Sequence, residues 1–294
     1  MTPDVDAFFD SRTSTVTYLV ADPATGAAAV IDPVLDFDPA TGRLWTESVD
    51  RVCEAVEAKG LRIERILETH PHADHLSGAQ EMRRRTGARL GVGARIVETL
   101  AVFSPRFEAH DVAPDGSGFD ELYVDGAVFG LGELQVRVLA TPGHTPACVT
   151  YLVGDAAFVG DTLFMPDFGT ARCDFPGGCA ETLYGSIHRI LALPGETRIF
   201  VGHDYPSGAG RSGPVWATTV AEQRAGNRHV RDGIDAEAFC AMRRERDAGL
   251  SAPTLLSQAL QVNIRAGRLP PPGEDGCVRL GVPVVPDREE IARA

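Results

Sequence analysis

Short apolar runs recur along the first two thirds of the chain, and they predict β-strands. Residues 15–20 and 27–31 form two such runs, and the turn-forming residues between them favour a β-hairpin. Further runs lie at residues 63–69, 88–92, 134–139, 149–153, 156–159 and 197–201. Their lengths and apolar content are typical of strands in a buried sheet.

Apolar residues at helical spacing occur between several of these strands. Val49, Val52, Cys53 and Val56 recur with that spacing before Gly60, which predicts an amphipathic helix packed on a sheet. Cys53 is therefore expected to belong to the core.

Other segments are predicted from helix formers and helix breakers. Residues 77–86 carry helix-forming side chains and stop at Gly87, so they predict a helix. Residues 103–121 are rich in Pro, Asp and Gly and predict a loop. Two later segments are expected to be helical, residues 221–225 and 236–243, and a Pro-rich irregular stretch follows at 269–276.

This order of elements predicts the fold class and the domain organisation. The strands and helices of residues 1–205 predict an α/β (α+β) domain, and the chain is long enough to bury a full core. Residues 206–294 are expected to form a helical extension packed on that domain, not an independent domain. Its extended end is a candidate subunit contact in a homo-oligomer.

Composition excludes several classes of partner. The formal charge of −13 argues against nucleic acid, because phosphate binding needs a basic surface. No apolar stretch approaches the roughly 20 residues that span a bilayer, and the acidic start lacks the features of a signal peptide. The six cysteines show no Cys-x-x-Cys pair, so free thiols are expected. A chain with free thiols and no export signal is expected to be cytoplasmic. The 27 arginines against the single Lys59 indicate a bacterial source.

Histidine and aspartate gather where strand-like runs end. Four potential ligands lie within six residues after the run at 63–69, and three more each follow a later run: His70, His72, Asp74, His75, His144, Asp161 and His203. Residues two apart on extended backbone point the same way, so His70 and His72 are expected to converge. Imidazole and carboxylate groups suit zinc or iron, and this set has enough ligands for one ion or two.

The pattern His-x-His-x-Asp-His, followed by the later His, Asp and His, resembles the metallo-β-lactamase superfamily. The resemblance covers residues from about 15 to 205. It implies an αββα sandwich with the metal ligands at one edge. No ligand is missing, which argues against an inactive sensor or scaffold.

Two branches of the superfamily fit these residues. The ligands match glyoxalase II, a hydrolase with two zinc ions. In that arrangement His70, His72 and His144 hold one ion, and Asp161 bridges to a second. The second ion is held by Asp74, His75 and His203. A hydroxide between the ions would then attack a glutathione thioester.

The sequence around the later ligands also resembles the persulfide dioxygenases, or sulfur dioxygenases. The similar segments are residues 141–151, 160–164, 173–184, 186–188 and 202–205. This resemblance implies one Fe(II), held by His70, His144 and Asp161. It also implies the oxidation of glutathione persulfide by O₂ to sulfite and glutathione, a step of sulfide detoxification.

The dioxygenase resemblance also assigns the groups around the iron. His72, Asp74, His75 and His203 would orient ligands and water. Of these, Asp74 and His75 are the catalytic candidates.

Two further residues are assigned by the same resemblance, each with an alternative. Arg172 is expected to bind a carboxylate of glutathione, or else to form a local ion pair with Asp174. Tyr205 is expected to hydrogen-bond bound oxygen or substrate, or else to be a core tyrosine. The family has a Cys before this Arg, whereas Cys173 follows it, so no role carries over to Cys173; Cys179 does match a family Cys.

Overall fold

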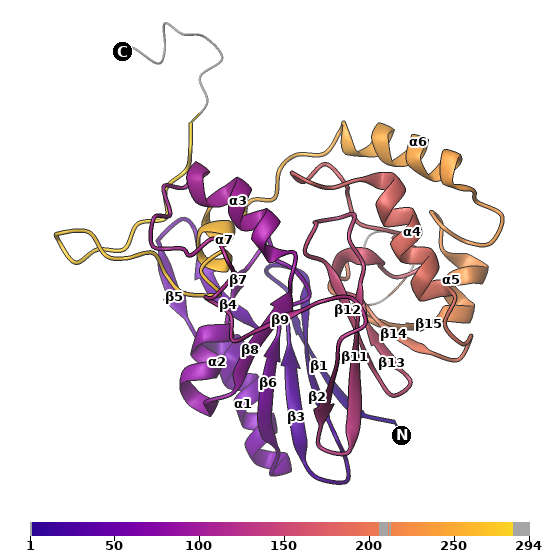
Figure 1. Ribbon diagram of the computed structural model, residues 1–294, viewed down its shortest axis with the longest axis horizontal. Coiled ribbons are helices and arrows are strands. Elements are labelled where there is room, and N and C mark those ends of the chain that lie inside the picture. Colours follow the sequence, from indigo (N-terminus) through magenta and orange to yellow (C-terminus); the bar gives the residue numbers. More distant parts are fainter. Residues whose placement is uncertain (1, 206–210, 212, 285–294) are drawn as a thin grey trace, which may run out of the picture.

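The computed structural model describes residues 2–205, 211 and 213–284, and two six-stranded sheets form its centre (Figure 1). The first sheet has the order β1-β2-β3-β6-β8-β9: Asp4–Asp10, Thr15–Ala21, Ala27–Ile31, Arg62–Leu67, Arg89–Gly93 and Glu121–Tyr123. Its first three strands are antiparallel, and the pairs from β3 to β9 are parallel.

The second sheet has the order β10-β11-β12-β13-β14-β15. Its strands are Val128–Leu131, Leu134–Ala140, Val149–Val153, Ala156–Phe158, Arg198–Phe200 and Ala217–Thr219. Only β13 and β14 pair in parallel, because α4 (Ala180–Leu191) connects them. A small third sheet consists of β5 (Arg43–Trp45), β4 (Val34–Asp38) and β7 (Leu76–Ser77).

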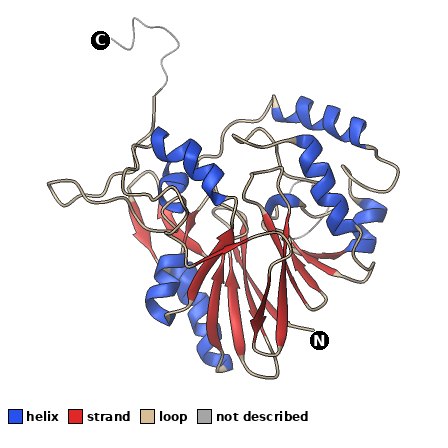
Figure 2. Ribbon diagram, in the orientation of Figure 1, coloured by secondary structure: helices blue, strands red, loops and turns tan. Residues whose placement is uncertain are grey.

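The two large sheets pack face to face, and helices cover their outer faces (Figure 2). Tyr18 and Ile31 of the first sheet share one buried cluster with Val136 and Phe158 of the second. The first sheet packs on its outer side against α1 (Glu47–Lys59), α2 (Ala79–Thr86), α3 (Ile96–Arg106) and α7 (Leu256–Asn263). The second packs against α4, α5 (Val220–Gly226) and α6 (Ala236–Asp247). The predicted αββα sandwich is confirmed.

Local patterning predicted most of these elements. The helix expected around Val52 is α1, and it ends at Gly60 in the left-handed conformation that glycine adopts without strain. Cys53 is half-buried and packs against the core, as expected.

The prediction of a loop at residues 103–121 was wrong for residues 103–106, which are helical. α3 continues to Arg106 because Leu100 and Phe103 remain on its buried face, although Pro105 in its last turn removes one N–H donor from the helix. Residues 107–120 are irregular as predicted.

The part of the chain after residue 205 is integrated with the sandwich. It adds β15 to the second sheet, α6 packs on α4, and α7 packs beside β7. A division at residue 205 stays a prediction. None of the helices in the described residues has the length and apolar character needed to cross a bilayer.

Candidate metal centre and its cavity

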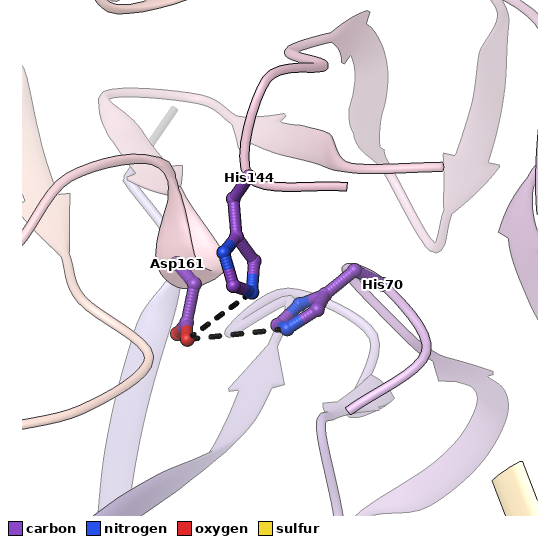
Figure 3. A group of neighbouring side chains, drawn as sticks. All are labelled: His70, His144 and Asp161. Carbon is purple, nitrogen blue, oxygen red and sulfur yellow. Dashed lines mark ion pairs between the residues drawn. The ribbon is translucent and has the colours of Figure 1, made fainter. Parts of the chain in front are cut away.

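Three of the predicted ligands meet at the edge of the sandwich where the strands end. His70 follows β6, His144 follows β11, and Asp161 lies in the short 3₁₀ helix Gly160–Thr162 after β13. Figure 3 shows their side chains pointing toward one another. Asp161 Oδ2 lies 4.0 Å from His70 Nε2 and 3.9 Å from His144 Nε2. The three ligand atoms lie within 4.8 Å of one another, close enough for the group to hold one ion.

Hydrogen bonds fix the ring orientation of both histidines. His144 Nδ1 donates to the carbonyl oxygen of Arg172 at 2.9 Å, which leaves Nε2 for a metal. His70 Nδ1 lies 3.0 Å from Thr69 Oγ1, whose own proton goes to Asp32 Oδ2 at 2.7 Å. Burial and the neighbouring His72 hold the pKa of His70 well below its usual value, so its ring is neutral and able to bind a metal.

His70 and His72 belong to different groups in the structure. The strand ends at Leu67, so the alternation expected for extended backbone does not reach His72. His72 Nε2 lies 3.1 Å from both Asp32 Oδ1 and Glu68 Oε2. Burial lowers the pKa of His72, but these two carboxylates raise it to about 10.

A second set of potential ligand atoms lies beside the first. His72, Asp74 and His75 offer atoms within 4.8 Å of one another. His72 Nδ1 and His75 Nε2 are buried and have no hydrogen-bond partner among the described residues. Because buried polar atoms are normally satisfied, these two nitrogens indicate room for a further ligand.

His203 lies between the carboxylates of the two groups. Its Nδ1 donates to Asp161 Oδ1 at 2.7 Å, and its Nε2 donates to Asp74 Oδ2 at 2.5 Å. Burial lowers the pKa of His203, but Asp161 and Asp74 raise it well above the usual value. His203 therefore holds one oxygen of Asp161 and leaves the other facing the two histidines.

A cavity of about 750 Å³ opens onto this centre. Asp74, His144 and Asp161 line it, and so do Arg172 and Tyr205. The opposite wall comes from the C-terminal extension: Arg243, Arg246, Leu250, Ser251, Pro253, Thr254 and Leu255. Arg243 and Arg246 lie in α6, part of which was predicted as a helix, whereas neither a motif nor a regular pattern marks residues 250–255 between α6 and α7.

Arg172 forms the local ion pair that was one of its two expected roles. Its Nε and Nη2 donate to the two carboxylate oxygens of Asp174 at 2.5 Å, and Nη1 donates to Ser251 O at 2.7 Å. To bind a substrate carboxylate, the guanidinium would have to give up some of these contacts. Substrate binding by Arg172 therefore stays a prediction.

Tyr205 and the two cysteines near Arg172 differ in their access to the cavity. The Tyr205 ring stacks parallel to His203 at 5.6 Å and lines the cavity. Cys173 and Cys179 do not line it. Burial raises the pKa of Cys173 to about 12, and the Cys179 thiol lies 3.4 Å from Glu181 Oε2. Neither thiol is placed to meet a substrate beside the centre.

Comparison with known proteins is consistent with this centre. Residues 11–203 match the family described as the metallo-beta-lactamase superfamily. A "Beta-lactamase hydrolase-like protein" of Agrobacterium fabrum is 50% identical over 96% of this chain, but the chain spans only 65% of that relative's length.

More distant relatives carry names from both candidate branches. The bovine "Persulfide dioxygenase ETHE1, mitochondrial" is 32% identical over 90% of this chain and 89% of its own. A "Hydroxyacylglutathione hydrolase" of Methylococcus capsulatus is 34% identical over 94% of this chain and 90% of its own. The crystal structure of ETHE1 from Myxococcus xanthus superposes with a TM-score of 0.72, at 33% identity, covering 90% of this chain and all of that one. On the fold, the ligand set and these matches, the chain belongs to the metallo-β-lactamase superfamily of metal-dependent enzymes.

Proposed function

We propose that this chain is an iron-dependent persulfide dioxygenase that converts glutathione persulfide, O₂ and water to sulfite and glutathione. The observation that carries the proposal is the group of His70, His144 and Asp161, two imidazoles and one carboxylate, of which His144 and Asp161 line a large cavity. Two His and one carboxylate are the ligands of many non-haem Fe(II) oxygenases. The relatives named persulfide dioxygenase support this choice.

The donor set fits iron, and the surrounding residues fit the role of holding it. A ferrous ion on these three ligands would supply neighbouring open positions for a persulfide sulfur and for O₂. His203 and Thr69 hold Asp161 and His70 in place by hydrogen bonds. We assign Tyr205, on the cavity wall beside His203, as a hydrogen-bond donor to substrate or oxygen.

A glutathione persulfide also needs a cation for its carboxylates. Four arginines line the cavity, and three of them already form ion pairs, Arg12 with Asp36, Arg172 with Asp174 and Arg243 with Asp247. The fourth, Arg246, forms no ion pair within the part of the chain that the structure describes. Partial burial and the nearby Arg243 lower the pKa of Arg246, so a substrate carboxylate would relieve the repulsion between the two arginines. We therefore assign Arg246 to the glutathione carboxylates.

Replacing Arg246 with glutamine is expected to raise KM for glutathione persulfide by about 10-fold, the low end for a charge-assisted contact because the side chain is exposed. Arg244→Gln is the matched control, since Arg244 lies on the same helix, is exposed and pairs with Glu181 away from the cavity. Steady-state kinetics should show no penalty for either variant with a persulfide that lacks carboxylates. Equal KM values for both variants with glutathione persulfide would remove Arg246 from the site.

A dinuclear zinc hydrolase of the glyoxalase II type, acting on a glutathione thioester, is the second candidate. The specific observation in its favour is the group of His72, Asp74 and His75, with two buried ring nitrogens that lack partners. His203, the other ligand that the second ion would need, has its Nε2 2.5 Å from Asp74 Oδ2.

Metal content separates the two candidates. Anaerobically purified protein is expected to carry about one iron per chain, the count implied by one three-ligand group. Elemental analysis makes this measurement, and two zinc ions per chain would instead favour the hydrolase. A cytoplasmic bacterial location, the absence of nucleic-acid and membrane partners, and a homo-oligomeric state stay predictions.

A further inference from the structure

One side chain of the C-terminal extension contacts the backbone of the ligand loop, the segment of residues 70–75 that carries four of the potential metal ligands. Asn263, at the end of α7, is buried. Its Nδ2 donates to the carbonyl oxygens of His72 at 2.8 Å and His75 at 2.9 Å. Its Oδ1 accepts the Ser77 N–H at 2.8 Å. The Asn263 carboxamide thus forms hydrogen bonds through both of its donors and its acceptor to a segment that lies more than 180 residues earlier in the sequence.

The ligand loop has little else to fix its backbone. Residues 70–75 lie in no helix or strand, and none of their backbone groups takes part in a backbone–backbone hydrogen bond within the described chain. A buried carbonyl without a hydrogen-bond partner is destabilising, so the His72 and His75 carbonyls need these donors. Asn263 therefore satisfies the two carbonyls and also sets the distance between them.

The side-chain contacts continue from Asn263 toward the ligands. The Ser77 N–H donates to Asn263, and the Ser77 hydroxyl donates to Glu68. Glu68 also accepts a hydrogen bond from His72 Nε2. Both ends of the loop are therefore tied to one buried network. The side chains of His72, Asp74 and His75 extend from the backbone that this network holds in place.

We infer that Asn263 is a positioning residue of the metal centre, which makes the C-terminal extension part of the site. Asparagine is required because the contact needs two donors and one acceptor in one plane. An aspartate of the same shape has no donor when ionised, and it would place its charge against two carbonyl oxygens. The inference concerns the ligand loop, so it holds for an iron or a zinc occupant alike.

The test compares two isosteric amide-to-acid substitutions on the same helix. Asn263→Asp removes both donors to the loop, whereas Gln261→Glu changes a buried side chain that contacts Ser257 and Gly281 but no loop residue. Zinc affinity, measured by chelator competition on each apoprotein, is expected to fall about 10-fold for Asn263→Asp. This is the low end for groups that orient metal ligands, because Asn263 acts on the ligand His70 only through the backbone of the same loop. Gln261→Glu should stay close to the unchanged protein.

Asn263→Ala gives a second variant that introduces no charge, and it is expected to lose affinity in the same direction. The melting temperature of each apoprotein shows whether the fold is kept. Weakened zinc binding at an unchanged melting temperature supports positioning. Unchanged affinity in both Asn263 variants, or unfolding of both apoproteins, would overturn the inference. Because zinc binding needs neither O₂ nor a persulfide, failure of the proposed dioxygenase activity would be seen separately.

Discussion

Asp161→Ala is expected to lose bound iron and oxygen-dependent turnover together. Asp161 supplies the only carboxylate of the three-ligand group, and an ion left on His70 and His144 alone would be weakly held and poorly neutralised. The loss of activity should be at least 100-fold, beyond the 10- to 100-fold typical of removing a group that only orients a ligand.

The measurement is iron per chain and the rate of O₂ consumption on the same preparation. Asp167→Ala is a suitable control, because Asp167 lies in the same loop region, is exposed and pairs with Arg211 instead of facing the two histidines. Full iron content in Asp161→Ala would show that this carboxylate is not a ligand. His70→Ala and His144→Ala should behave like Asp161→Ala.

His203→Ala is expected to keep most of its iron and to turn over 10- to 100-fold more slowly. His203 contacts Asp161 and Asp74 through hydrogen bonds, so its removal frees both carboxylates without removing a ligand from the three-residue group. His72→Ala should fall in the same class, since its Nε2 faces Asp32 and Glu68. Metal analysis beside steady-state kinetics makes the comparison. Metal loss as complete as in Asp161→Ala would indicate a centre with two ions.

Local patterning predicted the sandwich because its strands and helices carry their own signal. The apolar runs at 134–139 and 149–153 became β11 and β12, and the helix around Val52 ends at Gly60 as expected. β1 was not predicted, because its sequence is acidic and its strand conformation comes from pairing with β2. α7 was not predicted either, since its stability comes from packing beside β7.

The sequence predicted which residues are potential metal ligands, but not the orientation of every side chain. The spacing of His70, His144 and Asp161 after strands indicated a shared centre, because strand ends gather at one edge of a sheet. The orientation of His72 depends on Asp32, which lies 40 residues earlier in the chain. The contact from Asn263 spans almost 190 residues, and no local pattern encodes such a tertiary contact.

Oxygen consumption with glutathione persulfide, followed together with sulfite formation, tests the central claim most directly. The iron-loaded protein should consume about one O₂ for each sulfite formed, because both atoms of O₂ go to the outer sulfur and water supplies the third oxygen of sulfite as the S–S bond breaks. It should hydrolyse a glutathione thioester far more slowly. The same assay on Asp161→Ala should show neither reaction. Rapid thioester hydrolysis by a zinc-loaded protein, with no oxygen uptake from the persulfide under any metal, would contradict the claim.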